Sequence, residues 1–279
     1  MSEKKSLFLC PVCGKSLSIS ERKYACINRH SFDMAKSGYV NLMLSNQMNA
    51  KIPGDNKLMV KARNDFLEKG YYIGLLSAII EAVMEIPSDI KLLDAGCGEG
   101  YYTNGIYNAL KSSGRNVQAA GVDISKYALN SAAKRNKEIE FAVGSIFHLP
   151  VADDSCNILL NIFAPFCLSE FSRVIVSGGF MIMVVPGKKH LWQLKEIVYD
   201  NPYENELKSL AVEGFELFRH YTEKGKINIE NNNDIMNLFA MTPYYYRTGE
   251  KDKQKLLILK NLDTEIEFEI LVYRKKGSS

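Results

Sequence analysis

The sequence lacks any long apolar run. No window approaches the roughly 18 consecutive apolar residues that a membrane-spanning helix needs. The opening residues, Met-Ser-Glu-Lys-Lys, are not followed by the apolar stretch of a secretory signal. We therefore expect neither membrane insertion nor secretion, and a cytoplasmic location is the default prediction.

Net charge is also small, but it is unevenly distributed. The whole chain carries a formal charge of +3, whereas residues 1–51 hold eight Lys or Arg and three acidic residues. That segment therefore has a balance of +5, and the other 228 residues have a balance of −2. A basic segment beside a nearly neutral body favours contact with a polyanion such as RNA. A lysine-rich N-terminus that is only well solvated is the alternative, and charge alone does not decide between the two.

The chain has only six cysteines, and three of them lie close together near the N-terminus. Cys10, Cys13 and Cys26, together with His30, have the spacing C-x2-C-x12-C-x3-H. In a reducing compartment such a cluster indicates a metal site rather than disulfides. Three thiolates and one imidazole suit a closed, tetrahedral Zn²⁺ site with a structural role. The alternative, four unrelated residues, is disfavoured by the spacing of the two ligand pairs.

The body of the chain alternates between strand and helix patterns. We expect strands at 91–94, 117–122, 140–143, 157–162 and 180–184, with helices at 101–112, 125–136 and 168–175 between them. Gly178-Gly179 is expected to form the turn into the fifth strand. This rhythm predicts an α/β fold with a parallel sheet. Beyond residue 188 the pattern is weaker. A helix at 190–199, a loop at 231–234 and a final strand at 265–273 are expected, and 201–233 has no clear boundary.

A glycine-rich turn follows the first expected strand. Leu92-Leu93 leads into Asp94, and then Gly96, Gly98 and Gly100 occupy alternate positions. The pattern G-x-G-x-G differs from the dinucleotide fingerprint G-x-G-x-x-G. With an acidic residue just before the glycines, it is typical of the first motif of S-adenosylmethionine-dependent methyltransferases. The missing β-carbons let the backbone approach the methionine part and ribose of that cofactor.

Further cofactor contacts are predicted from the ends of the next strands. Asp123 ends the second strand, where a carboxylate can bind both ribose hydroxyls, although an Asp that only leads into a helix is the alternative. Ser145 and Ile146, after the third strand, fall where adenine should lie. Gly96, Gly98 and Glu99 would line the methionine end. Glu99 is also explained as a first-turn acid favoured by the helix dipole.

The target of methylation is expected near the end of the fourth strand, at Asn161-Ile-Phe-Ala-Pro-Phe166. This stretch departs from the Asn-Pro-Pro-Tyr form that is typical of exocyclic amine methylation, so adenine N6 chemistry is not inferred. The proton acceptor is not identified. Glu170, Asp153 and His148 lie near the pocket by topology, and solvated surface roles are the plainer interpretation for all three.

Three segments follow from these motifs. Residues 1–46 are predicted to form a zinc-binding module for RNA recognition, 47–57 a linker, and 58–279 the methyltransferase domain. The expected fold class is α/β, a class I Rossmann-like S-adenosylmethionine methyltransferase domain with a small N-terminal zinc-binding module.

Together these motifs resemble the bacterial 23S rRNA guanine-N1 methyltransferases of the RlmA type over nearly the whole chain. The matching stretches are the Cys10, Cys13, Cys26 and His30 spacing, Phe32-Asp-Met-Ala-Lys, Gly38-Tyr-Val-Asn-Leu42, Pro53-Gly-Asp55, Ala62-Arg63, Gly96-Cys-Gly-Glu-Gly-Tyr-Tyr-Thr103, Pro186-Gly187, His190-Leu191 and Met241-Thr-Pro243. A zinc module joined to this glycine motif is more specific than either half alone.

The resemblance implies methylation of N1 of a guanine in a hairpin of 23S rRNA domain II. It also implies that Tyr72 and His190 help to bind S-adenosylmethionine, alongside Gly98 and Glu99. Asp94, the acidic residue of the glycine motif, is also predicted to bind the cofactor. The expected partners are then 23S rRNA and no membrane. A homodimer is compatible with the sequence, which does not set the oligomeric state. Two alternatives stay open: a zinc-bearing methyltransferase acting on tRNA or another RNA, and an RNA-binding protein without catalytic activity.

Overall fold

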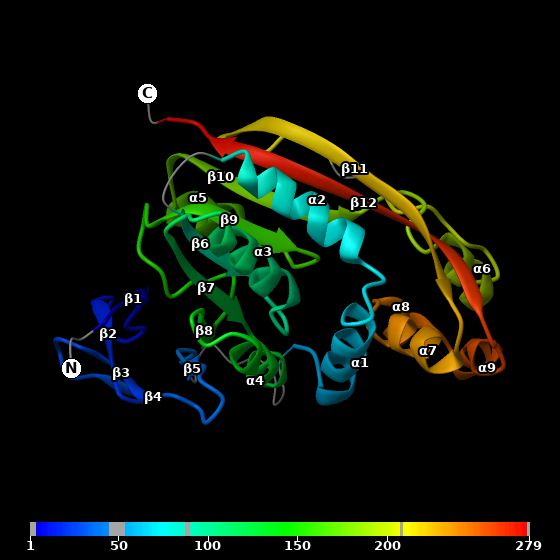
Figure 1. Cartoon of the computed structure of the whole chain (residues 1–279), viewed down its shortest axis with the longest axis horizontal. Coiled ribbons are helices and arrows are strands. Elements are labelled where there is room, and N and C mark those ends of the chain that lie inside the picture. Colours follow the sequence, from blue (N-terminus) through cyan, green and yellow to red (C-terminus); the bar gives the residue numbers. More distant parts are fainter. Residues whose placement is uncertain (1–3, 45–53, 87–89, 207–208, 278–279) are drawn as a thin grey trace.

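The computed structural model describes residues 4–44, 54–86, 90–206 and 209–277, so most of the linker expected at 47–57 lies outside the described residues. One large sheet runs through the molecule, with most helices on one face (Figure 1). A small N-terminal β-ribbon lies at one end of the molecule, and three C-terminal helices lie at the other (Figure 1). Within the described part of the chain, no helix has the length and apolar character that crossing a bilayer requires.

The large sheet has the strand order β11-β12-β10-β9-β6-β7-β8-β5. Its central strands are parallel, as predicted: β6 (Ile90–Ala95), β7 (Val117–Asp123), β8 (Glu140–Val143), β9 (Cys156–Ile162) and β10 (Ile175–Pro186). β12 (Leu262–Lys275) and β11 (Phe215–Ile229) then pair antiparallel along one edge. The order reverses beside β6, which places the glycine turn at the switch point where such sheets bind ligands.

Nine helices are present in the described residues. They are α1 (Lys57–Leu67), α2 (Ile73–Met84), α3 (Tyr101–Ser112), α4 (Lys126–Arg135), α5 (Leu168–Val174), α6 (Trp192–Val198), α7 (Asn232–Ala240), α8 (Tyr244–Arg247) and α9 (Glu250–Leu257). Side-chain hydrogen bonds cap the first turns of several of these helices. The Asn56 side chain accepts from the amides of Leu58 and Met59 at 2.9 and 3.1 Å, and the Ser125 hydroxyl accepts from the Ala128 amide at the start of α4.

Two local predictions were wrong, and one region without a prediction turned out to be a strand. Gly178-Gly179 does not turn into a new strand, because β10 already begins at Ile175 and the two glycines fall in an irregularity of its pairing with β9. The expected loop at 231–234 is the start of α7, whose first turn is capped by the Asn231 side chain on the Asp234 amide at 2.9 Å. The unassigned region 201–233 contains the long strand β11.

The N-terminal ribbon packs onto the face of the sheet that lies opposite α2 and α3. Its strands β1 (Lys4–Leu9), β2 (Ser16–Ser20), β3 (Lys23–Cys26) and β4 (Ser31–Asp33) pair in chain order. Phe8 and Leu17 share a buried apolar cluster with residues of β6, β7 and α5. The Ser6 hydroxyl donates to buried Glu140 of β8 at 2.5 Å. β5 (Val40–Asn41) then extends the large sheet beside β8, so the ribbon is joined to the body through both packing and strand pairing.

Candidate metal centre and cofactor site

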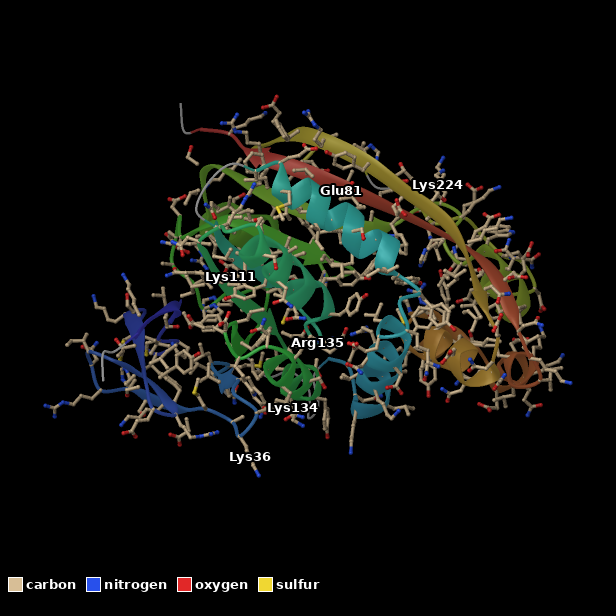
Figure 2. All side chains as sticks on the ribbon, in the orientation of Figure 1. Lys36, Glu81, Lys111, Lys134, Arg135 and Lys224 are labelled. Atoms are coloured by element: carbon tan, nitrogen blue, oxygen red, sulfur yellow. The ribbon has the colours of Figure 1, made fainter. Side chains whose placement is uncertain are left out.

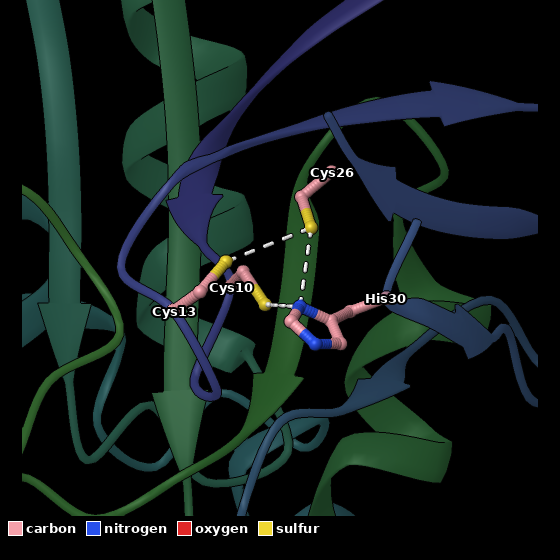
Figure 3. Close-up of side chains that lie close together, drawn as sticks. All are labelled: Cys10, Cys13, Cys26 and His30. Carbon is pink, nitrogen blue, oxygen red and sulfur yellow. Dashed lines mark hydrogen bonds between the residues drawn. The ribbon is translucent and has the colours of Figure 1, made fainter. Parts of the chain in front are cut away.

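Two tight turns of the ribbon bring the predicted metal ligands together (Figure 3). Cys10 and Cys13 lie on the turn after β1, where Gly14 has a φ of 69° and its amide donates to the Cys10 carbonyl at 2.8 Å. Cys26 ends β3, and the Arg29 amide closes a second turn onto its carbonyl at 2.9 Å, just before His30. The spacing seen in the sequence therefore corresponds to two loops that face each other.

The ligand atoms have the separations that tetrahedral zinc requires. Cys13 Sγ and Cys26 Sγ lie 3.7 Å apart, and His30 Nδ1 lies 3.5 Å from the sulfurs of both Cys10 and Cys26. All four ligand atoms are within 4.8 Å of one another. Zinc bonds of about 2.3 Å to sulfur and about 2.0 Å to nitrogen imply roughly 3.8 Å between sulfurs and roughly 3.5 Å from sulfur to nitrogen. The donor set thus fits one Zn²⁺ ion held by three thiolates and one imidazole.

The glycine turn between β6 and α3 is shaped by close contacts. Gly96, Gly98 and Gly100 have φ values of 93°, 54° and 77°, which residues with a β-carbon rarely adopt. A β-carbon on Gly96 would lie 2.4 Å from that of Ala164, and one on Gly100 would lie 2.9 Å from that of Ala132. Two of these glycines are therefore required by packing as well as by backbone conformation.

Two buried carboxylates stand beside this turn. Asp94 accepts a hydrogen bond from the Thr103 hydroxyl at 2.6 Å through Oδ2, and its buried Oδ1 has no partner. Burial raises its pKa to about 7, against the Thr103 hydrogen bond and with some help from the charges of Asp123 and Glu99. Asp123 accepts from the backbone amides of Gly98 at 2.9 Å and Ser125 at 2.8 Å, while burial raises its pKa.

A third buried carboxylate, Glu99, lies at the same turn and pairs with Arg63. Glu99 is 2% exposed, and its Oε2 makes no hydrogen bond in the structure. Burial raises its pKa, and the positive charge of Arg63 opposes the shift. Arg63, from α1, lies 3.6 Å from Glu99 Oε2 and 2.5 Å from Asp55 Oδ2. Sequence reasoning assigned no role to Arg63 or Asp55, because no motif links α1 to the glycine turn.

Tyr72 and His190, taken from the resemblance, belong to one aromatic cluster. Their ring centroids lie 6.1 Å apart, and both rings pack on Phe268 of β12, at 5.0 and 4.7 Å. The Tyr72 hydroxyl is buried without a partner. His190 Nδ1 accepts from the Glu267 amide at 3.3 Å, and burial, with the nearby Lys195 charge, lowers the His190 pKa to about 3. The imidazole is therefore neutral near pH 7.

The loop after β9 packs against the glycine turn, with Ala164 beside Gly96. The Asn161 side chain donates to the carbonyls of Ala95 at 3.3 Å and Pro165 at 3.0 Å, which fixes the path of the loop. Phe163 has a φ of 53° and is 45% exposed, with its ring 5.8 Å from that of Phe268. A bulky residue with positive φ is a rare conformation that usually marks a functional or strained position.

The remaining predicted residues make contacts with other parts of the protein. Ser145 Oγ accepts from the Phe147 amide at 3.2 Å, in the turn after β8. Ile146 is buried in the apolar cluster shared with the ribbon. Glu170 and Asp153 both pair with Arg173, at 2.7 and 2.8 Å, so neither is a free base in this structure.

The buried groups and the glycine turn fit S-adenosylmethionine. Asp94 Oδ1 and Glu99 Oε2, which have no hydrogen-bond partner, are buried acceptors that suit an ammonium group. The Gly98 backbone lies beside Arg63, since a β-carbon there would be 3.4 Å from its Nη1. A buried polar atom without a partner costs free energy unless a ligand or water satisfies it. The residues present therefore match the polar end of that cofactor.

Comparisons with known proteins give two family matches. Residues 8–51 match a zinc-ribbon family described as "RlmA, N-terminal", and residues 86–248 match a family described as "Methyltransferase domain".

Three curated relatives are similar over much of the chain. "Putative 23S rRNA (guanine-N(1)-)-methyltransferase YxjB" of Bacillus subtilis is 29% identical, over 97% of this chain and 98% of its own. "Putative 23S rRNA (guanine-N(1)-)-methyltransferase" of Micromonospora griseorubida is 32% identical, over 66% of this chain and 67% of its own. "23S rRNA (guanine(748)-N(1))-methyltransferase" of Streptomyces fradiae is 30% identical, over 66% and 65%.

Proposed function

Because this chain belongs to the S-adenosylmethionine-dependent methyltransferases with an RlmA-type zinc ribbon, we propose that it methylates N1 of a guanine in a hairpin loop of 23S rRNA domain II. The observation that carries the proposal is the joining of two sites in one fold. A metal centre that fits zinc lies at one end, and a glycine turn lined by buried carboxylates lies at the switch point of the sheet. Two relatives are named as 23S rRNA guanine-N1 methyltransferases, which supports this chemistry and this class of RNA.

We propose that the cofactor contacts come from the ends of neighbouring strands. Asp94, Gly96, Gly98 and Glu99 would hold the methionine end. Asp123 would bind the ribose, Ser145 and Ile146 would lie at the adenine, and Tyr72 and His190 would close the pocket over Phe268. Because His190 is neutral, it would contribute packing and a hydrogen bond rather than charge. When bound, S-adenosylmethionine supplies an electrophilic methyl group on a sulfonium centre.

The chain itself would act by positioning. Methyl transfer is an in-line displacement, so its rate depends mainly on the alignment of the acceptor with the methyl group and on the exclusion of water. The Asn161-anchored loop would present the target base, and a hairpin loop permits unstacking of a guanine at low cost. The ribbon, within predicted module 1–46, would orient the RNA through exposed basic residues such as Lys36, which points away from the body (Figure 2).

Primer extension on 23S rRNA from a deletion strain tests the proposal. Methylation at N1 blocks base pairing, so one reverse-transcription stop at a domain II guanine should vanish in the deletion and return with the wild-type gene. The guanine that corresponds to 748, after which the Streptomyces fradiae relative is named, is the first position to examine. Asp94→Ala should fail to restore the stop, whereas the exposed control Glu213→Ala should restore it. An unchanged set of stops in the deletion strain would contradict the proposal.

A further inference from the structure

Arg63 is a largely buried cation inside the cofactor site. It projects from α1 toward the glycine turn, and its side chain is 23% exposed. A β-carbon built on Gly98 would lie 3.4 Å from Arg63 Nη1. The guanidinium pairs with Asp55 and Glu99 and also feels the charge of Asp123. Although burial opposes the charged form, these carboxylates raise the Arg63 pKa, so the group stays ionised.

The surroundings of Arg63 are strongly acidic. Asp55, Asp94, Glu99 and Asp123 interact with one another or with Arg63, and both Asp94 and Glu99 carry a buried oxygen without a hydrogen-bond partner. S-adenosylmethionine carries a sulfonium and an ammonium, which suit such a site, but it also carries a carboxylate. A carboxylate placed among buried acids needs a cation beside it, because a buried like-charge contact is strongly unfavourable.

The neighbouring cation, Arg135, is held by contacts that link three helices. Its guanidinium donates to the Glu99 carbonyl at 3.3 Å, to Asn64 Oδ1 at 2.8 Å and to the Glu68 carboxylate, and it lies over the Tyr101 ring. These contacts tie α4 to α1 and to the start of α3. Arg63, by contrast, is engaged by carboxylates of the site itself, and its 3.6 Å separation from Glu99 is longer than a hydrogen bond.

We propose that Arg63 binds the α-carboxylate of S-adenosylmethionine. This inference deepens the proposed function, since it rests on the cofactor site, but it does not depend on the RNA substrate. In the ligand-free protein Asp55 and Glu99 neutralise Arg63. On binding, the cofactor carboxylate takes the place of Glu99 at the guanidinium, and Glu99 becomes an acceptor for the cofactor ammonium. The Arg63–Glu99 ion pair of the ligand-free protein is thus replaced by two pairs, Arg63 with the cofactor carboxylate and Glu99 with the cofactor ammonium.

Calorimetric titration with two ligands tests this assignment without measuring catalysis. The ligands are S-adenosylhomocysteine and its decarboxylated analogue, which keeps the ammonium and lacks only the carboxylate. The wild-type protein should bind the analogue about tenfold to a hundredfold more weakly, the range expected for one charge-assisted contact. Arg63→Met should weaken S-adenosylhomocysteine binding by a similar factor and should bind both ligands alike. Arg63→Lys should recover part of the difference between ligands.

Two further measurements keep the test decisive. Lys61→Met on the same helix, where Lys61 is 70% exposed, is the matched control and should leave both affinities unchanged. A thermal melt of each variant checks folding, and the comparison of ligands on the wild-type protein stands even if Arg63→Met unfolds. Equal losses for both ligands in Arg63→Met, with the wild-type preference kept, would overturn the inference. Failure of the wild-type protein to bind either ligand would instead overturn the cofactor site itself.

Discussion

At the residue scale, the protonation of Asp94 should control cofactor binding. Its pKa in the ligand-free protein is raised to about 7, chiefly by burial, whereas the cofactor ammonium needs the ionised carboxylate. Below pH 7 a proton must therefore leave on binding, so the affinity for S-adenosylhomocysteine should rise up to tenfold per pH unit and level off above about 7. Calorimetry across pH 5.5–8.5 measures this, at about half-unit steps.

The comparison variant for this prediction is Asp94→Asn. It should bind more weakly and show a flat pH profile, and exposed Asp263→Asn should follow the wild type. An unchanged slope in Asp94→Asn would assign the proton to another group. The same raised pKa makes the ligand-free protein less stable as pH rises from 3.8 towards about 7, because the unfolded chain ionises first.

A single methyl group at Gly96 should damage the site. Gly96→Ala places a β-carbon 2.4 Å from that of Ala164 at a φ of 93°, so either the turn or the loop after β9 must move. We expect a loss of about 1–3 kcal/mol of stability and at least tenfold weaker S-adenosylhomocysteine binding. Urea unfolding and calorimetry measure the two effects. Gly225→Ala in the edge strand β11, where the added carbon would make only ordinary contacts of 3.6 and 3.7 Å with Ile266, should be nearly neutral in both.

The sequence predicted the parts of the site that belong to one continuous motif. Asp94 and the glycines could be found because strand, turn and helix are consecutive in the chain. Arg63 and Asp55 could not, because Arg63 reaches the turn from α1 and Asp55 from the residues just before that helix, and neither has a spacing that links it to the glycines. Ile146 was positioned by topology alone, and topology does not say which face a side chain takes. Its side chain lies in the apolar cluster beside the ribbon.

At the element scale, the metal should hold the ribbon together. The four short strands bury few side chains of their own, so zinc ligation is expected to supply much of their folding free energy. Cys13→Ser should abolish stoichiometric zinc and expose the amides of β2 and β3 to hydrogen exchange. The methyltransferase domain should still melt cooperatively. Zinc release to a colorimetric chelator and exchange mass spectrometry provide the measurements.

The matched control for the zinc prediction is Cys167→Ser. Cys167 is partly exposed, and its thiol contacts only Ser169 Oγ, at 3.5 Å, among the described side-chain hydrogen bonds. This variant should retain its metal and its exchange pattern. Full zinc content in Cys13→Ser would show that the ligand set is different from the one assigned.

The strand β11 was missed for a physical reason. Strand prediction depends on alternating burial, but most of its residues from Glu216 to Lys226 are exposed, since it is the edge of the sheet. A bulge between Leu217 and Arg219 also shifts the alternation by one residue. Its partner β12 is buried on both faces and was predicted from its sequence. Charged edge strands resemble loops when only local pattern is available.

At the scale of the whole molecule, the uneven charge should govern RNA affinity. Exposed Lys15, Lys23 and Arg29 lie on the ribbon, in the segment with a balance of +5. Replacing all three with Gln should weaken binding to the target hairpin. The slope of log affinity against log salt should also fall by about 0.7–0.9 for each RNA phosphate that the ribbon no longer neutralises. Fluorescence anisotropy at several salt concentrations measures the slope.

The control for this prediction uses the opposite end of the molecule. Lys251→Gln with Lys260→Gln removes exposed charges at α9 and the turn that follows it. These changes should leave the salt slope unaltered. Equal slopes for the ribbon variant and the wild type would mean that the RNA does not contact the ribbon through these cations.

The pairing of β5 with β8 has a consequence for biosynthesis. Val40 pairs with Ala142 and Asn41 with Val143. The ribosome therefore makes the edge strand β5 about a hundred residues before its partner β8. The four metal ligands are complete by residue 30. We therefore expect the ribbon to be able to bind its metal on the nascent chain before β8, the strand that pairs with β5, has been made. Protease digestion of stalled chains that end before and after β8 would time the docking.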